Sequence, residues 1–144
     1  MSLERWESLG YIVNHLARQF ADDLGHRIAA HGVAVGQFPL LLVLWQEEGI
    51  SQVELSRRLA IEPATTTNTL ARMERDGLVE RRADPGDKRG SRVYLTERGR
   101  ELEEPVTAAA RAVNARAVQN LSAGEAADLN HLLGKVMRGL EETD

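Results

Sequence analysis

Two short helices separated by only three residues constrain the fold of this chain more than any other sequence feature. Ser51 is placed to cap the first helix, which the pattern predicts to run through Leu59. Pro63 opens the second helix, since proline is tolerated in a first turn, and this helix is predicted to stop at Gly77. The link 60–62 is too short for anything but a tight turn. The sequence therefore predicts a helix-turn-helix pair.

A basic hairpin is predicted directly after this pair. Two extended runs, Leu78–Arg82 and Arg92–Leu95, flank the turn-forming segment 84–90. The hairpin carries five cations, Arg81, Arg82, Lys88, Arg89 and Arg92. A cationic tip at this place can enter a minor groove or hold phosphate, and we expect Asp84 and Asp87 to pair with neighbouring arginines and fix the loop. Helix, turn, helix and basic hairpin together predict a winged helix-turn-helix.

Long amphipathic helices are predicted on both sides of this module. The first runs from near residue 3 to 31–32, and a second from about 35 to 48, with Phe38, Leu41, Leu42 and Trp45 turned inward and Gly49 as its C-cap. After the hairpin, Thr96 caps a helix to about residue 120, with Pro105 as a possible kink, and Ser122 and Glu125 form a capping box that opens the last helix. The predicted fold class is mainly α with a small β-hairpin.

The outer helices carry more apolar surface than one small core can bury. The stripes comprise Leu9, Ile12, Val13, Leu16, Phe20, Leu24 and Ile28 in the first helix, and Leu129, Leu132, Leu133, Val136, Met137 and Leu140 in the last. Pairing across a two-fold axis would cover them, which predicts a homodimer with its two recognition helices about one DNA turn, ~34 Å, apart.

Charge is distributed unevenly along the 144 residues. The net charge is −4, yet residues 51–100 hold eleven Arg and Lys against eight Asp and Glu, and the rest holds seven against fourteen. A basic middle between acidic ends suits a protein with one surface for a polyanion. Cysteine is absent, which excludes disulfides and thiol oxidation sensing, and no run of about 18 apolar residues is present. We expect a single cytoplasmic domain without a membrane partner or a cofactor.

The second helix of the pair has two distinct faces. At 100° per residue, Thr66, Leu70, Met73 and Gly77 share one face and are predicted to pack inward. The opposite face is small, polar or cationic, so that its backbone can approach base edges; Asn68 suits an adenine and a threonine methyl suits thymine. The predicted DNA-contacting residues are Ser51, Gln52, Ala64, Thr65, Thr67, Asn68, Arg72, Arg75, Lys88, Arg89 and Arg92.

Residues 70–81 (LARMERDGLVER), 84–89 (DPGDKR) and 93–99 (VYLTERG) resemble the MarR family of bacterial transcriptional regulators. The resemblance implies a homodimeric repressor of a pseudo-palindromic operator, with a winged part over 35–100 and dimerisation helices over 1–32 and 101–144. It also implies that the wing aspartate, Asp87, orients an arginine, Arg89, that enters the minor groove. Asn68 stands where relatives often have a longer basic residue, which bears on the operator sequence rather than on the binding mode.

The resemblance further implies release from DNA by a small aromatic or phenolic anion bound between the dimer helices and the winged part. Residues that could line such a cleft are Trp6, Tyr11, His15, Arg18 and Trp45. A metal-responsive regulator is an alternative, through Asp22, Asp23, His26 and His31, because Asp22 and His26 share a helix face. A winged-helix module that binds protein rather than DNA is another. An enzyme is not expected, since the chain lacks a phosphate loop, a nucleophile elbow and a His-Glu metal motif.

Overall fold

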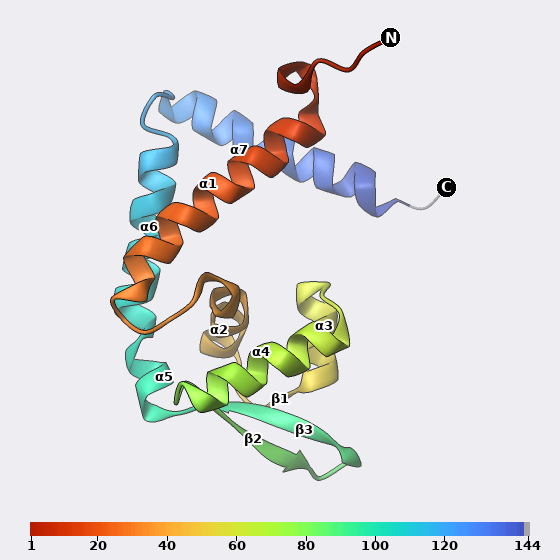
Figure 1. Cartoon of the computed structure of the whole chain (residues 1–144), viewed down its shortest axis with the longest axis vertical. Coiled ribbons are helices and arrows are strands. Elements are labelled where there is room, and N and C mark those ends of the chain that lie inside the picture. Colours follow the sequence, from red (N-terminus) through yellow and green to blue (C-terminus); the bar gives the residue numbers. More distant parts are fainter. Residues whose placement is uncertain (143–144) are drawn as a thin grey trace. The chain divides into compact units, whose positions relative to one another are not determined.

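The computed structural model describes residues 1–142 and divides the chain into two compact units, residues 1–109 and residues 110–144. Helices dominate both units, and a small sheet lies in the first (Figure 1). The elements in chain order are η1 (Arg5–Glu7), α1 (Leu9–Ala29), η2 (Val35–Gln37), α2 (Phe38–Gln46), β1 (Ile50–Ser51), α3 (Gln52–Leu59), α4 (Pro63–Arg75), β2 (Val79–Asp84), β3 (Asp87–Leu95), α5 (Glu97–Glu101), α6 (Glu103–Ala117) and α7 (Ala123–Glu141).

The helix-turn-helix pair forms where the sequence predicts it. The hydroxyl of Ser51 accepts a hydrogen bond from the backbone N–H of Glu54 at 3.1 Å and caps α3, and Pro63 occupies the first turn of α4. The turn between them spans residues 60–62, with Ala60 in the left-handed conformation at φ +52°. The prediction of this pair is confirmed.

The hairpin belongs to a three-stranded antiparallel sheet with the order β1-β3-β2. Val79 pairs with Leu95 at one end of the hairpin, and a bulge at Ala83 and Asp84 lies near the tip. The strands are longer than the extended runs predicted from the sequence, so the turn between them is confined to Pro85 and Gly86. The sequence analysis missed β1, a strand of two residues whose partners on β3 lie more than 40 positions away.

One apolar core holds the first unit together. Leu55 of α3, Leu70 and Met73 of α4, and Val93 of β3 are fully buried in it. The carboxyl-terminal part of α1 contributes Ile28, α2 contributes Leu40, Leu41 and Leu44, and α6 contributes Val106. Because α3, α4 and the sheet all pack on this core, the surface that they present outward has a fixed geometry.

Two predicted helices differ from the structure at their ends. The first begins at Leu9 rather than near residue 3, because the side chain of Ser8 caps it and a separate short turn, η1, precedes it. The helix predicted from Thr96 is interrupted at Leu102 instead of at Pro105 and ends at Ala117. Pro105 lies in the first turn of α6, where its missing N–H breaks no helical hydrogen bond.

Three residues of the first unit, Leu42, Gly49 and Gly77, are placed differently from the sequence prediction. Leu42 is exposed, and Leu40 and Leu44 are buried in its place. Gly49 is not a helix cap; α2 ends at Gln46, and Gly49, at φ +76°, donates its N–H to the carbonyl of Val93 as the chain enters β1. Gly77 is exposed rather than packed inward, and its φ of +73° turns the chain from α4 into β2.

The second unit contains the end of α6 and the whole of α7. The capping box that opens α7 is confirmed: Glu125 N–H donates to the hydroxyl of Ser122 at 3.1 Å, and Ser122 N–H donates to the carboxylate of Glu125 at 2.9 Å. Apolar side chains of α7 are exposed on the single chain, Met137 to 58% and Leu132 to 55%.

Candidate nucleic-acid interface

The α4 helix has one buried and one exposed face, as the sequence predicts. Thr66, Leu70 and Met73 are completely buried. The opposite face is exposed and carries Ala64, Thr65, Thr67, Asn68, Arg72 and Arg75. This face is small at the start of the helix and cationic toward its end, which suits insertion into a DNA groove.

The exposed residues of α4 differ in how much of their hydrogen-bonding capacity remains available. Within residues 1–142, the side chains of Thr65, Asn68 and Arg72 make no hydrogen bond or ion pair. Thr67 is engaged, since its hydroxyl donates to the carbonyl of Pro63 at 3.0 Å. Arg75 pairs with the neighbouring Asp76 at 3.2 Å. The full amide of Asn68 and the guanidinium of Arg72 are thus available to a ligand.

The α3 helix braces α4 through polar as well as apolar contacts. The hydroxyl of Ser56 donates to Oγ1 of Thr66 at 2.8 Å in the buried contact between the two helices. Ser51 and Gln52, which we predicted to touch DNA, have partners within the protein. Ser51 caps α3, and the Gln52 amide donates to Thr67 at 2.5 Å. The structure therefore gives the Ser51 side chain a part in capping α3 and the Gln52 side chain a part in holding α3 against α4.

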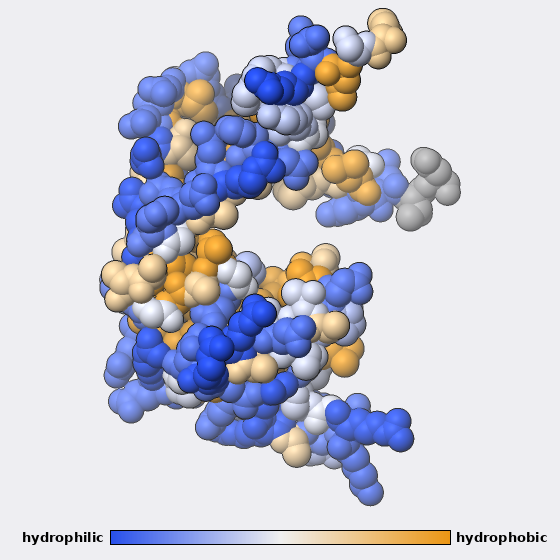
Figure 2. All heavy atoms as spheres, in the orientation of Figure 1, coloured by the Kyte–Doolittle hydropathy of each residue, from blue (hydrophilic) through white to orange (hydrophobic). Residues whose placement is uncertain are grey.

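Three of the five hairpin arginines and lysines are committed to contacts within the protein. We call residues 79–95, which form β2, β3 and their turn, the wing; hydrophilic side chains cover it (Figure 2). Arg81 pairs with Glu74 of α4 at 2.5 Å. The guanidinium of Arg82 lies 4.0 Å from the centre of the Tyr94 ring, while Arg92 donates to the carbonyl of Gly49 at 2.7 Å and pairs with Asp84 at 3.3 Å.

Lys88 and Arg89 are the cations of the wing that remain available. Both are exposed, and neither side chain makes an ion pair or hydrogen bond within the described part of the chain. They lie next to the turn at Pro85 and Gly86, at the end of the hairpin. Two adjacent free cations at the tip are placed to meet a phosphate or a minor groove.

The two aspartates of the tip shape the turn, although one does so differently from our expectation. Asp84 accepts from the backbone N–H of Gly86 at 2.9 Å and pairs with Arg92, as expected. Asp87 was expected to hold a guanidinium, but its carboxylate accepts from the backbone N–H of Arg89 at 2.9 Å. A side chain that holds the backbone fixes where Arg89 leaves the strand and leaves its guanidinium free.

Hydrogen bonds keep several carboxylates of the module ionised. The backbone N–H of Gly86 and the Arg92 guanidinium lower the pKa of Asp84, and the amide of Gln37 and Arg75 lower the pKa of Asp76. Arg57 and Arg58 together lower the pKa of Glu54 to about 2. These acids are negative at neutral pH and occupied by internal donors, so they offset little of the free positive charge of Arg72, Lys88 and Arg89.

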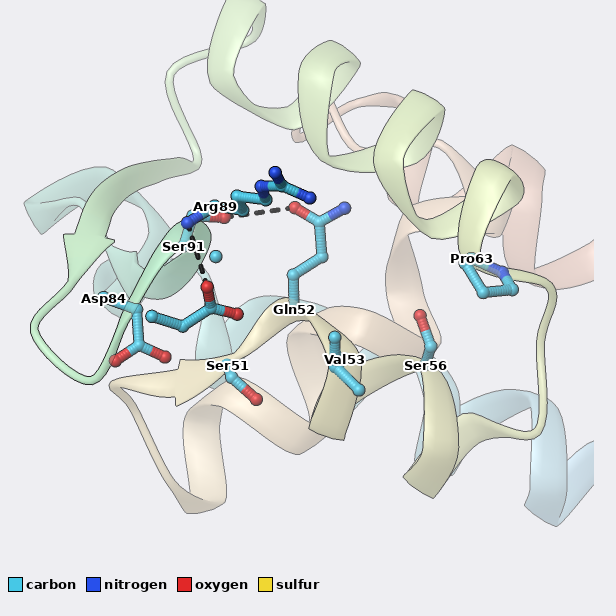
Figure 3. A pocket seen from close by; sticks show the side chains of 10 residues that line it. Ser51, Gln52, Val53, Ser56, Pro63, Asp84, Arg89 and Ser91 are labelled. Atoms are coloured by element: carbon cyan, nitrogen blue, oxygen red, sulfur yellow. Dashed lines mark hydrogen bonds between the residues drawn. The ribbon is translucent and has the colours of Figure 1, made fainter.

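A cleft of about 390 Å³ lies between the start of α3 and the wing. Figure 3 shows Gln52 extending from α3 toward Ser91 and Arg89 on the wing side, with Pro63 at the start of α4 on the other side. The hydroxyl of Ser91 donates to Oε1 of Gln52 at 3.2 Å across this cleft. Gln52 thus links helix pair and wing, and the sequence analysis missed this because Ser91 lies 39 positions away.

Of the five residues predicted to line an effector cleft, the structure brings three together. The ring of Trp6 lies 5.2 Å from the rings of both Tyr11 and His15, which share one face at the start of α1. Arg18 is exposed on the same helix. Trp45 is separate from them: it packs against the core beside Phe38, and its Nε1 donates to the carbonyl of Gly99 at 2.9 Å.

The residues of the metal alternative make other contacts. Nδ1 of His26 lies 2.6 Å from the backbone carbonyl of Asp22, and Asp23 pairs with Arg27 at 3.0 Å. Residues 1–142 contain no group of three His, Asp or Glu side chains close enough to hold a metal ion. In the same range, no helix is long and apolar enough to cross a membrane.

A helix pair with an exposed polar outer helix, followed by a hairpin with a free cationic tip, defines a winged-helix DNA-binding protein. The sequence model of the MarR family matches residues 34–91, which cover the helix pair and most of the wing. The chain belongs to the MarR family and is a transcriptional regulator, and its relatives are regulators rather than enzymes.

Two curated relatives illustrate the sequence similarity. The HTH-type transcriptional regulator TtmR of Methylorubrum extorquens (strain PA1) is 37% identical over 95 residues, 66% of this chain and 49% of the relative, so this chain matches about half of TtmR. The HTH-type transcriptional repressor Rv2887 of Mycobacterium tuberculosis (strain ATCC 25618 / H37Rv) is 28% identical over 128 residues, which are 89% of this chain and 92% of the relative.

Solved structures match nearly the whole chain. A MarR transcriptional regulator from Methanosarcina mazei Go1 is similar with a TM-score of 0.85 and 30% identity, covering 92% of this chain and 96% of the other. A MarR mutant from E. coli in complex with operator DNA is similar with a TM-score of 0.83 and 29% identity, covering 89% and 92%. The predicted fold class and the resemblance to the MarR family are confirmed.

Proposed function

We propose that this protein is a homodimeric repressor that binds a pseudo-palindromic operator and leaves it when a small aromatic or phenolic anion binds. The observation that carries the DNA-binding part is the exposed face of α4, where the side chains of Asn68 and Arg72 have no hydrogen bond or ion pair within residues 1–142. Lys88 and Arg89 add two similarly free cations at the wing tip. Polar groups that the fold does not use are available for bases and phosphates.

Exposed apolar side chains support the homodimer. On α1, Leu9 is 56% exposed, and Ile12, Val13 and Leu16 are also exposed. On α7, Leu129, Leu132, Val136, Met137 and Leu140 are exposed in the same way. Each set recurs at helical spacing, so each is a continuous apolar surface that a monomer would leave in water. A second copy of the chain would cover it and would supply the second recognition helix that a two-fold operator needs.

Repression is proposed on the strength of a relative, and release by an effector on the strength of a local cluster. Rv2887, which aligns along most of the chain, is named a repressor. The Trp6, Tyr11 and His15 rings form an aromatic surface near the start of α1, and Trp6 is 54% exposed. An aromatic surface with a histidine and nearby Arg18 suits a flat anion.

The proposal is tested by selection of bound sequences from random duplex DNA, together with sedimentation of the free protein. We expect enrichment of one inverted repeat, with half-sites about one helical turn apart, and a dimer at micromolar concentration. The dissociation constant is expected in the range of about 10⁻⁸–10⁻¹¹ M at moderate salt. A monomer at these concentrations, or enrichment of no sequence, would contradict the proposal.

Binding of the effector is tested by tryptophan fluorescence, because Trp6 lies in the aromatic cluster and Trp45 packs against the core. In a Trp45→Phe variant, Trp6 is the remaining tryptophan, so a change in its emission on titration with a hydroxybenzoate locates the anion at the aromatic cluster. We expect this signal together with release of DNA. Release of DNA without a change in Trp6 emission would mean that the anion binds elsewhere. A change in Trp6 emission without release of DNA would mean that the anion binds at the cluster but does not regulate DNA binding.

A further inference from the structure

The side chain of Gln52 lies at the centre of a chain of hydrogen bonds that joins the recognition helix to the wing. Its Nε2 donates to Oγ1 of Thr67 on α4 at 2.5 Å. Its Oε1 accepts from the hydroxyl of Ser91 on β3 at 3.2 Å (Figure 3). The same oxygen accepts from Nη1 of Arg81 on β2 at 3.5 Å. Three elements therefore meet at one amide, which lies at the first residue of α3.

The orientation of this amide follows from the chemistry of its partners. An arginine guanidinium can only donate hydrogen bonds, so the oxygen of Gln52 must face Arg81 and the NH₂ group must face Thr67. Arg81 is itself held by the carboxylate of Glu74 on α4 at 2.5 Å. Because the amide nitrogen can only donate, the hydroxyl of Thr67 is an acceptor in this contact.

This contact determines what Thr67 can offer to DNA. A threonine hydroxyl has one proton to donate and two lone pairs to accept. Thr67 gives its proton to the carbonyl of Pro63 at 3.0 Å and one lone pair to Gln52. What remains on this exposed residue is a methyl group and a single lone pair. Guanine N7 and O6, adenine N7 and thymine O4 are acceptors, so none of them can receive a hydrogen bond from Thr67.

We propose that Gln52 is a positioning residue for base recognition, which holds the hydroxyl of Thr67 inside the protein so that α4 presents the Thr67 methyl group to the C5-methyl of a thymine. This inference rests on the proposed function, because it assumes that α4 enters the major groove. Thr65 and Asn68 lack such internal contacts in residues 1–142 and keep their polar groups for hydrogen bonds with bases.

The test compares thymine with uracil, which differ by the C5-methyl group alone. Each thymine of the selected operator is replaced in turn by uracil, and the affinities of wild type, Thr67→Val and Thr67→Ser are measured. At one thymine per half-site, wild type and Thr67→Val are expected to lose about fourfold in affinity, the value of one buried methyl group. Thr67→Ser keeps the hydroxyl without the methyl and should bind thymine and uracil equally.

The part played by Gln52 is tested with the same ratio of affinities. Gln52→Ala should lose most of the discrimination between thymine and uracil, because the Thr67 hydroxyl, without its contact to Gln52, can turn toward DNA in place of the methyl group. Valine at this position needs no such restraint, since both of its branches are methyl groups. Ser91→Ala is the matched control, since it removes a contact to the oxygen of Gln52 and leaves the contact to Thr67. A ratio measured within one variant does not depend on its overall stability or active fraction, so a purely structural loss leaves it unchanged.

Several outcomes would overturn the inference. Equal binding of thymine and uracil by wild type would show that Thr67 contacts no thymine methyl group, and loss of discrimination in Thr67→Val would show that the Thr67 hydroxyl is required for it. A selected adenine or cytosine opposite Thr67 would show that its remaining lone pair accepts from a base. Unchanged discrimination between thymine and uracil in Gln52→Ala would show that Gln52 does not position Thr67. Enrichment of no sequence by wild type would overturn the proposed function, and this inference with it.

Discussion

The recognition helix and the wing use their polar side chains in opposite ways. On α4, the exposed Thr65, Asn68 and Arg72 make no side-chain hydrogen bond or ion pair within residues 1–142. In the wing, most of the cations are bound by other parts of the protein. Arg81 is held by Glu74, and Arg92 by Asp84 and a backbone carbonyl.

The difference teaches that a count of basic residues overstates the charge that DNA can use. A guanidinium that already has a carboxylate partner gains little from a phosphate, because the existing pair must be broken or shared. The free cations of the wing are Lys88 and Arg89, at its tip. Most arginines of the wing therefore stabilise the protein itself, and the free positive charge is confined to the tip. In α4, the buried face packs on the core and the exposed face keeps polar groups such as the Asn68 amide free.

The largest effect is expected on the helix side of this comparison. Asn68→Ala should relax the base preference at one or two base pairs of each half-site, at a cost of about 1–3 kcal/mol for the preferred base. Arg72→Ala is the control, because a cation on the same face should contact phosphate and weaken all duplexes alike. Affinities for the selected operator and its single-base variants separate the two. A uniform loss for Asn68→Ala would mean that Asn68 contacts phosphate.

The next largest effect on operator affinity is expected in the wing, where a free cation is compared with a paired one. Arg89→Ala should weaken operator binding by about tenfold or more, roughly 1.4 kcal/mol, and reduce the salt dependence, since one fewer counterion is released. Arg82→Ala is the matched control, because Arg82 is occupied by Glu80 and the Tyr94 ring. Titrations at several salt concentrations measure both. Equal slopes for Arg89→Ala and wild type would contradict the contact at the wing tip.

A smaller effect is expected from the residue that supports Arg89. Asp87→Ala should weaken binding severalfold, because the carboxylate no longer holds the backbone N–H of Arg89. Asp87→Asn keeps an oxygen acceptor and should bind at least as tightly as wild type, since it also removes a negative charge near DNA. If charge alone mattered, both variants would bind more tightly. Tighter binding by Asp87→Ala would therefore contradict the proposal that Asp87 orients Arg89.

The smallest effect concerns a carboxylate that serves the fold rather than DNA. Arg57 and Arg58 lower the pKa of Glu54 to about 2, below its ordinary value of 4.5. Its contribution to stability is therefore present above about pH 4.5 and is lost as the pH falls toward 2. In urea unfolding at one protein concentration, Glu54→Gln should lose less stability than wild type between pH 7 and pH 3. Operator affinity at neutral pH should not change, and a clear loss there would give Glu54 a part in DNA binding.

Local sequence signals determined the helix-turn-helix pair and both faces of α4. A serine cap at Ser51, a proline in the first turn at Pro63, and the seam of Thr66, Leu70 and Met73 act over a few residues. The capping box at Ser122 is equally local. Such signals are readable because the groups that satisfy one another are within four positions, so the sequence sets their distance almost by itself.

Only the tertiary structure decided which polar groups are free. Two wing arginines are held by partners far along the chain: Arg92 by the carbonyl of Gly49, 43 positions away, and Arg81 by Gln52, 29 positions away. The same holds for the strand β1, which exists because Ile50 meets Val93. Periodicity assigns a face to each residue, but it carries no information on which distant groups meet there. The sequence thus identified the winged helix-turn-helix, and the packing of its elements decided that, within residues 1–142, the side chains of Thr65, Asn68, Arg72, Lys88 and Arg89 stay without an internal partner.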